Sequence, residues 1–178
     1  MKKLAAIGVA FALMWSLSGC VVSSDGSSSM EENSNETSSE EQSTEAGNAA
    51  TVGGTLLDAS DVAITLLSVK STKKGSFGSG PDNDYFLIAK FELDNQSDEE
   101  VAISSLMSFA LDGESGRGYD ITLFVDLDGN LDGSIKPGRK MLGEIAFDAS
   151  KENLYYLSVQ TGLFDEGVEF QFGPSDIQ

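Results

Sequence analysis

The sequence is poor in the residues on which most enzyme active sites depend. Its 178 residues include no histidine, one cysteine, one tryptophan and three prolines. Without histidine the chain lacks the usual proton shuttle and a common zinc ligand, and a single cysteine excludes an internal disulfide. Basic residues are also scarce, because 11 Lys and Arg stand against 29 Asp and Glu, a net charge of −18. Nucleic acid is therefore not an expected partner, since its backbone is bound by clustered positive charge.

The first residues have the character of an export signal. Lys2 and Lys3 precede a run of fourteen uncharged, mostly apolar residues from Leu4 to Leu17. As a helix this run would measure roughly 21 Å, which is too short for a bilayer core of about 30 Å. The pattern favours a cleaved secretory segment over a membrane-spanning helix.

The end of that segment, Leu17-Ser18-Gly19-Cys20, resembles the lipobox of bacterial lipoprotein signal peptides. The resemblance implies cleavage between Gly19 and Cys20, removal of residues 1–19, and a diacylglyceryl group on the cysteine thiol. Such a group supplies two acyl chains, the number that stable membrane anchoring requires. The expected localisation is the extracytoplasmic face of the cell membrane. The alternative is an uncleaved membrane anchor in which the cysteine is incidental.

Residues 20–50 form the second predicted segment, a lipidated cysteine followed by a tether. Between Val21 and Ala50 there are nine Ser, six Glu and one Asp, and there is no Lys, Arg, Pro or aromatic residue. A segment of this composition cannot bury enough apolar surface to offset the entropy of ordering it, so it is predicted to be disordered. Its function is interpreted as a spacer that lifts the following domain away from the lipid headgroups; the alternative is a filler segment with no selected length.

Residues 51–178 are predicted to fold as one all-β domain. They carry 22 acidic and nine basic residues, and their apolar residues alternate with polar ones in the period of a β-strand. Two runs, 62–69 and 101–111, slip by one residue, which predicts a β-bulge in each. The run 85–94 alternates cleanly only in its second half, which suggests a central strand that emerges at an edge. The remaining strands are expected at 121–125, 141–147, 154–159 and 168–172.

These runs predict an immunoglobulin-like antiparallel β-sandwich of seven to eight strands. The turns between them support this prediction, since Pro137-Gly138 suits the two central positions of a type II turn. The Cys…Trp…Cys core pattern of antibody domains is absent, and Trp15 would be removed with the signal.

Three stretches of this domain resemble a known family. They are Tyr85 to Ser97, an apolar strand ending in Asn-x-Ser; Phe109 to Asp120, a strand leading to a Gly-rich turn and Tyr119; and Lys136 to Phe147, Pro-Gly followed by Gly-x-x-x-Phe. Together they resemble the telokin-like domain of unknown function that is common in Gram-positive surface lipoproteins. The resemblance implies an immunoglobulin-like fold and extracytoplasmic placement, and it supplies no catalytic residues.

One acidic motif is a candidate metal site. Asp126, Asp128, Asn130 and Asp132 place an oxygen-bearing side chain at every second position, and Ca²⁺ is bound by six to eight oxygens. The motif is not an EF-hand loop, because its sixth position is Leu131 and its twelfth is Pro137. The alternative interpretation is a solvated acidic loop before the Pro-Gly turn.

The sequence thus predicts a non-catalytic binding or interaction module, anchored in the membrane at the cell surface. Apart from the lipid on Cys20 it requires no cofactor, and its partner is an unidentified protein or cell-wall component. Most of the aromatic side chains are expected in the core, with a ligand groove as the alternative, and an exposed sheet edge is a second candidate binding surface. One alternative is a Ca²⁺-responsive structural domain that depends on residues 126–132. The other is a hydrolase that uses two of the many carboxylates, although no pair is marked as convergent.

Overall fold

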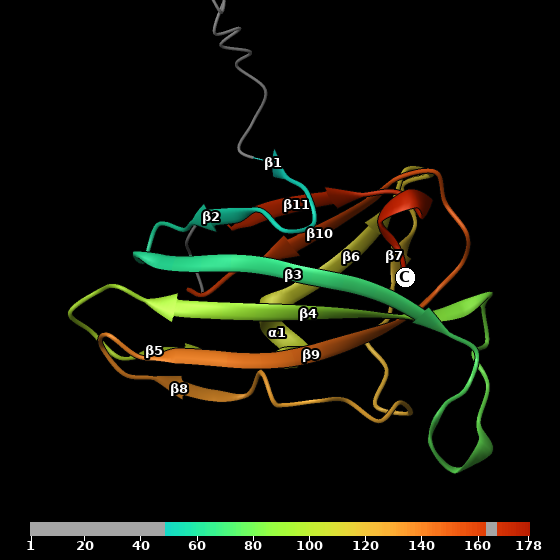
Figure 1. The fold of residues 1–178 in the computed structure, drawn as a ribbon, viewed down its shortest axis with the longest axis horizontal. Coiled ribbons are helices and arrows are strands. Elements are labelled where there is room, and N and C mark those ends of the chain that lie inside the picture. Colours follow the sequence, from blue (N-terminus) through green and yellow to red (C-terminus); the bar gives the residue numbers. More distant parts are fainter. Residues whose placement is uncertain (1–48, 163–166) are drawn as a thin grey trace, which may run out of the picture. The chain divides into compact units, whose positions relative to one another are not determined.

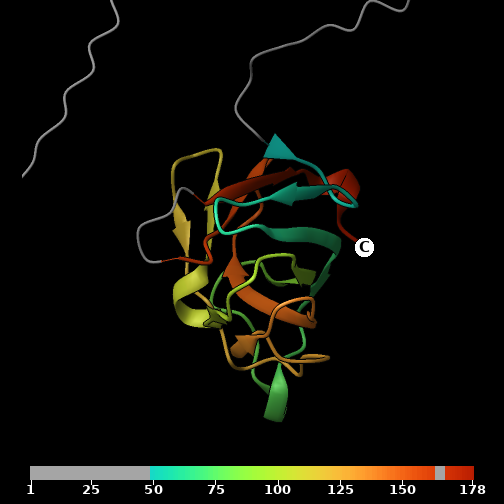
Figure 2. The same ribbon diagram turned by 90° about the vertical axis from the view of Figure 1, so that its left-hand side faces the viewer.

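A computed structural model describes residues 49–162 and 167–178 of the chain. These residues form two facing sheets, shown from the side in Figure 1 and along the strands in Figure 2. The first sheet has the strand order β1-β11-β10-β6-β7, with β1 at Ala49–Ala50, β11 at Val168–Phe172, β10 at Tyr155–Val159, β6 at Phe109–Gly113 and β7 at Gly118–Tyr119. The second has the order β2-β3-β4-β9, with β2 at Thr55–Leu57, β3 at Val62–Thr72, β4 at Tyr85–Asn95 and β9 at Lys140–Ala149.

The long strands follow the immunoglobulin arrangement. Lettered in chain order, β3, β4, β6, β9, β10 and β11 correspond to strands A, B, C, E, F and G, with A-B-E in one sheet and C-F-G in the other. The predicted all-β sandwich of immunoglobulin type is therefore confirmed. The pairs are antiparallel except at β1, which runs parallel to β11. A separate two-stranded sheet pairs β5 (Val101–Ile103) with β8 (Gly133–Ile135).

The main core lies between the two sheets and takes alternate residues from each long strand. Phe91 of β4 is fully buried and contacts aromatic rings of the opposite sheet, with ring centroids 5.3 Å from Phe109 and 5.9 Å from Phe170. Such pairs add stability beyond the apolar area that they bury. The period-two alternation of the sequence is thus the signature of one buried face on each strand.

One predicted bulge is present and the other is not. The pairing of β3 with β4 shifts between Leu66 and Ser68, which leaves Leu67 as the extra residue. In the stretch 101–111 the prediction of a bulge is wrong, because the short helix α1 (Ser105–Ser108) separates β5 from β6. The shift in the alternation of apolar residues is caused by this helical turn, which exposes two apolar side chains, Leu106 and Met107.

The segment 121–125 is not the strand that was expected. It makes one isolated bridge, between Ile121 and Phe147, and continues as a loop over the outer face of the second sheet. Val125 of this loop is buried there with Phe86 and Ile88 of β4. The interpretation of 85–94 as a strand that emerges at an edge is therefore wrong. β4 is paired on both sides along its length, and its apolar outer residues are covered by the loop.

The Pro137-Gly138 turn is confirmed. Gly138 has φ 65°, and the Arg139 N–H donates to the Lys136 carbonyl at 3.0 Å. Beside it, the buried amide of Asn95 donates to the Glu99 and Ile135 carbonyls at 2.7 and 2.8 Å. The Asn-x-Ser pattern at residues 95–97 is thus a structural junction between loops.

Candidate functional site

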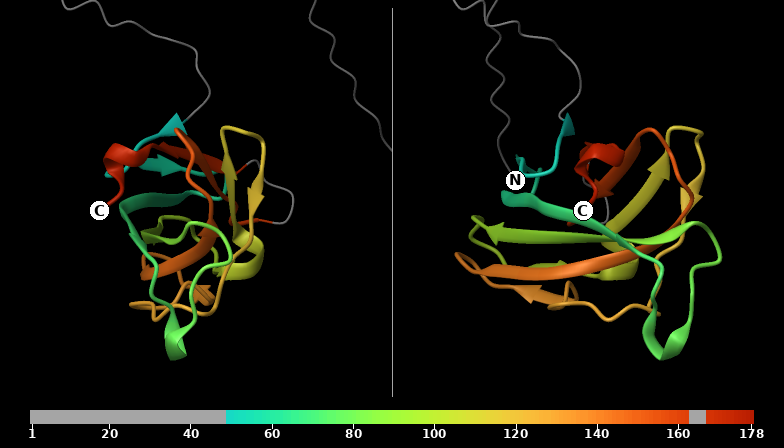
Figure 3. Two further views of the ribbon diagram at one scale, coloured as in Figure 1. Left: turned by 90° about the vertical axis from the view of Figure 1, so that its right-hand side faces the viewer. Right: turned by 45° about the vertical axis from the view of Figure 1, so that its right-hand side comes forward.

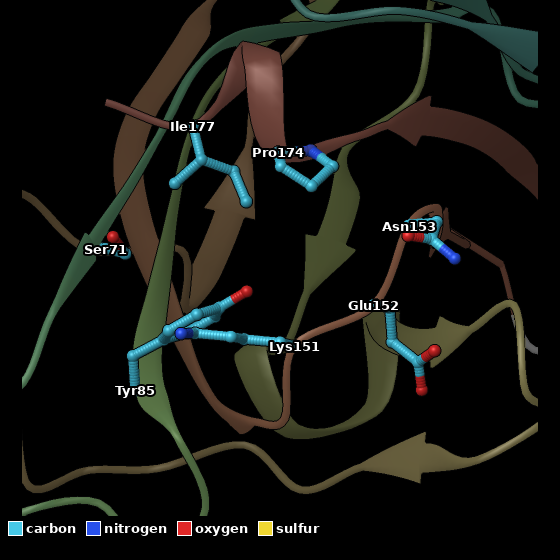
Figure 4. A pocket seen from close by; sticks show the side chains of 7 residues that line it. All are labelled: Ser71, Tyr85, Lys151, Glu152, Asn153, Pro174 and Ile177. Atoms are coloured by element: carbon cyan, nitrogen blue, oxygen red, sulfur yellow. The ribbon is translucent and has the colours of Figure 1, made fainter.

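A cleft lies at the end of the sandwich where β3 finishes and β4 begins. Its volume is about 470 Å³, and Figure 4 shows the side chains that line it, Ser71, Tyr85, Lys151, Glu152, Asn153, Pro174 and Ile177. They come from β3, β4, the β9–β10 connection and the C-terminal residues. Residues distant in the sequence therefore meet in this one cleft.

The C-terminal residues form one wall of the cleft by joining the second sheet. After β11, the short 3-10 helix η2 (Pro174–Asp176) turns the chain, and the Asp176 carboxylate accepts the Gly173 N–H at 2.9 Å. Gln178 then exchanges backbone hydrogen bonds with β3, from its N–H to the Val69 carbonyl and from the Ser71 N–H to its carbonyl, both 3.0 Å. The chain end thus connects the sheet that contains β11 to the sheet that contains β3.

Tyr155, at the start of β10, organises the floor of the cleft. Its fully buried hydroxyl donates to the Ser150 carbonyl at 2.6 Å and accepts the Glu152 N–H at 3.0 Å. The Tyr85 hydroxyl lies 2.5 Å from the same oxygen and donates to it, because the Tyr155 proton is already used. Burial, reinforced by the bond to Tyr85, raises the pKa of Tyr155, so its hydroxyl stays protonated. A tyrosine at the start of strand F that bonds to backbone upstream is the tyrosine corner of immunoglobulin folds.

Glu152 holds a second group of hydrogen bonds beside the first. Its carboxylate accepts the Ser115 hydroxyl at 2.5 Å and the Tyr119 hydroxyl at 2.7 Å. The Ser115 bond, followed by the Tyr119 bond, lowers the pKa of Glu152. Burial, and then the bond and charge of Glu152, raise the pKa of Tyr119 to about 12. A Cβ on Gly113 would lie 2.5 Å from the carboxylate, so this approach requires glycine.

The hydrogen bonds of these groups determine what the cleft can do. At neutral pH Glu152 is ionised and Tyr119 is protonated, so the carboxylate has no proton to give and the phenol is not a base. Of the other residues that line the cleft, Lys151 supplies an ammonium group, Asn153 an amide, and Pro174 and Ile177 an apolar surface. This set suits binding, and it contains no activated nucleophile.

The four candidate Ca²⁺ ligands do not converge. Asn130 and Asp132 bond to each other within one turn, whereas the carboxylates of Asp126 and Asp128 have separate partners. Their contacts are Asp126 with the Ser76 hydroxyl at 2.9 Å, Asp128 with the Lys90 ammonium at 3.1 Å, and Asp132 with the Ser105 N–H and hydroxyl at 2.8 and 3.0 Å. Across residues 49–162 and 167–178, no group of three or more His, Cys, Asp or Glu is placed to hold a metal ion.

A buried carboxylate that sequence reasoning did not single out holds this acidic loop on the sheet. Glu144 of β9 is 4% exposed, and it accepts the Lys70 ammonium at 2.8 Å and the Asp128 N–H at 3.0 Å. Nearby, a Cβ on Gly143 would lie 2.8 to 2.9 Å from the Asn130 backbone, so the loop can approach only a glycine. The available signal was the Gly143-Glu144 pair inside the otherwise apolar run from Met141 to Phe147.

Stability at alkaline pH tests the Tyr119 interaction. Because folding raises the pKa of Tyr119 from 10.0 to about 12, the folded chain holds a proton that the unfolded chain loses between these values. Its contribution is complete below pH 10 and declines as the pH rises toward 12. We expect Tyr119→Phe to make this decline in unfolding free energy shallower in urea titrations at stepped pH. Tyr156→Phe, on the other face of β10, is the matched control, and an equal effect of both variants would contradict the assignment.

Thermal unfolding tests the Ca²⁺ interpretation of Asp126, Asp128, Asn130 and Asp132. We expect residues 20–178 to melt at the same midpoint in millimolar Ca²⁺ and in chelator, because an ion would have to displace the Lys90 and Ser76 contacts. A midpoint that rises with Ca²⁺, and that no longer rises in Asp128→Asn, would establish the cation site instead.

Gly19 and Cys20 lie outside the described residues, so their predicted roles stay predictions. Among the residues that the structure does describe, no helix is long and apolar enough to cross a membrane.

Three solved structures share this fold at low sequence identity. The Bacillus subtilis protein ycdA, described as a "putative lipoprotein", is 15% identical with a TM-score of 0.57, and the match covers 71% of this chain and 40% of that one. Bacillus subtilis yjhA is 14% identical with a TM-score of 0.56, over 69% and 98% of the two chains. The secreted Mycobacterium tuberculosis protein MPT63 is 15% identical with a TM-score of 0.51, over 71% and 96%.

This chain thus spans less than half the length of ycdA. A comparison with curated proteins gave no match. Residues 50–169, which are more than half of the chain, match a family described as a domain of unknown function, DUF4352. The chain therefore belongs to the DUF4352 family.

Proposed function

We propose that this protein is a lipid-anchored, extracytoplasmic binding module without catalytic activity. The observation that carries the proposal is the position of the only cysteine, Cys20, at the end of the apolar segment and ahead of an acidic, serine-rich stretch. The lipobox and telokin-like resemblances agree with it, as do the descriptions of ycdA as a putative lipoprotein and of MPT63 as secreted.

Anchoring must come from the acyl chains because net charge opposes membrane association. With Lys2 and Lys3 removed, the chain from residue 20 carries a net charge of −20, and both anionic lipids and anionic wall polymers repel it. Two acyl chains supply an attraction that does not depend on charge. The single cysteine is then consumed by the lipid and leaves no free thiol in an oxidising compartment.

The cleft supports binding in preference to catalysis. The bonds from Ser115 and Tyr119 lower the pKa of Glu152 and keep it ionised, whereas burial, reinforced by the bond from Tyr85, raises the pKa of Tyr155 and keeps it protonated. A hydrolase of the two-carboxylate type needs one carboxyl group that keeps its proton. The groups left for a ligand are Lys151, Asn153 and an apolar wall, which suit a peptide or cell-wall fragment.

Cell fractionation tests the anchor. Cys20→Ser removes the only thiol that can take a lipid, so we expect it to shift the protein from the membrane fraction to the soluble or secreted fraction. Val22→Ser, which introduces the same residue outside the lipobox, should remain membrane-bound. Recovery of Cys20→Ser in membranes washed with high salt would rule out lipid anchoring.

Site-specific crosslinking tests the cleft. A photoreactive amino acid in place of Asn153, which is exposed at the cleft, should capture a partner in cells when the lipidated protein is irradiated. The same amino acid in place of Gln96, which is exposed beyond the far end of β4, should not. Equal capture at the two positions would mean that the cleft is not the binding surface.

A further inference from the structure

The loop between β3 and β4 presents an unusual phenylalanine. Phe77 lies in the 3-10 turn η1 (Ser76–Gly78), has φ 57° and is completely exposed, with a relative accessibility of 106%. A bulky side chain at positive φ is rare, and backbone of this kind persists only where the surrounding structure holds it. The loop projects beyond the sheets at the end where β3 finishes (Figures 1 and 3).

Hydrogen bonds hold the turn that displays this side chain. The Ser76 N–H donates to the Phe124 carbonyl at 2.6 Å, and the Ser76 hydroxyl donates to the Asp126 carboxylate at 2.9 Å. Within the turn, Gly75 N–H and Ser79 carbonyl bond at 2.9 Å. A Cβ on Gly75 would lie 2.5 Å from the Phe124 carbonyl oxygen, so two segments about fifty residues apart are fitted closely together.

This contact gathers three exposed apolar side chains, which we call the apolar tip: Phe77, Leu123 and Phe124. Leu123 and Phe124 are 73% and 64% exposed. Large exposed apolar side chains on segments that contact each other are a candidate surface for contact with another body.

Two exposed lysines lie beside the apolar tip in the sequence. Lys73 and Lys74 immediately precede the turn, are exposed, and form no ion pair within residues 49–162 and 167–178. The lysines on the outer face of the second sheet, by contrast, are paired with carboxylates. Aromatic residues next to basic ones are the combination that settles at the headgroup level of a membrane with anionic lipids.

We propose that the apolar tip docks into the headgroup region of an anionic phospholipid bilayer, with Lys73 and Lys74 over the lipid phosphates. The proposal rests on the lipid anchor proposed above for Cys20, which would hold the domain beside such a bilayer. Residues 21–48 lie between that cysteine and β1 and span at most roughly 95 Å when extended, which is enough for any face of the domain to reach the surface. A linker of this kind gives the domain an effective concentration near the millimolar range at the surface, so that the docked state is populated even when docking is weak.

The test uses the absence of tryptophan after residue 19, since Trp15 is the only one in the chain. Phe77→Trp therefore places a single fluorescent reporter at the apolar tip. Residues 20–178 are coupled through the Cys20 thiol, the only one present, to maleimide lipid in vesicles of equimolar phosphatidylglycerol and phosphatidylcholine. We expect a blue shift of the emission and quenching by brominated acyl chains. Chemical coupling makes this outcome independent of whether the cell lipidates Cys20.

Leu57→Trp is the matched control, because Leu57 is an exposed leucine of β2, well away from the loop. Its tryptophan should show neither shift nor quenching on the same vesicles. Replacing Lys73 and Lys74 with Gln in the coupled Phe77→Trp chain should lower the equilibrium constant for docking about 30-fold, about fivefold for each lysine, and should reduce the blue shift and the quenching with it. Equal responses from the two reporters, or none from Phe77→Trp, would overturn the proposal. So would a shift that requires an added cell-surface protein extract and not the vesicles, since the tip would then be a protein interface.

Discussion

The buried ring and hydroxyl of Tyr155 connect most of the elements at one end of this sandwich. The ring stacks on Phe172 of β11 with centroids 5.2 Å apart and lies 6.3 Å from the ring of Tyr119 in β7. The hydroxyl reaches the β9–β10 connection and Tyr85 of β4. Because an unsatisfied buried hydroxyl is costly, the strands that meet here cannot separate independently. The position of Glu152, and with it the shape of the cleft, follows from this one side chain.

A second constraint explains the acidic motif that suggested a cation site. The loop at 121–132 covers the outer face of the second sheet, where Phe86 and Ile88 would otherwise be exposed. Leu127 packs on that outer cluster and Leu131 is buried in the main core. From Val125 to Asp132, the leucines at 127 and 131 and Val125 are buried or half-buried, whereas Asp126, Asp128, Asn130 and Asp132 are exposed. The residues of the Asp-x-Asp-x-Asn-x-Asp motif are thus the exposed side of this segment. The Glu144 carboxylate holds the segment on the sheet by accepting the Asp128 N–H.

The alternation of apolar and polar residues in the sequence predicted the positions of the main strands. The long strands 85–95, 140–149 and 168–172 were recognised because their inner residues are apolar, and the bulge at Leu67 because it shifts that phase. The same periodicity gave a wrong prediction where a tertiary contact buries the outer side chains of a strand. Phe86 and Ile88 are covered by a loop about forty residues later in the chain, and no local window shows this. The Glu152–Tyr119 pair could not be predicted either, since each residue is ordinary alone and the bond joins β7 to the β9–β10 connection.

The net charge of the protein and the local charge of its apolar tip affect its approach to a membrane differently. Residues 20–178 carry a charge of −20, which an anionic membrane repels, and at physiological salt ions screen this repulsion beyond about 8 Å. At contact, only the groups within that distance matter, and around the apolar tip these include the lysines at 73 and 74. Asp126 is also near, with its carboxylate bonded to the Ser76 hydroxyl. The proposed lipid anchor would offset this repulsion, because it would hold the chain at the surface whatever its net charge. An anchor at Cys20 and an apolar tip flanked by Lys73 and Lys74 together would select one orientation that neither would select alone.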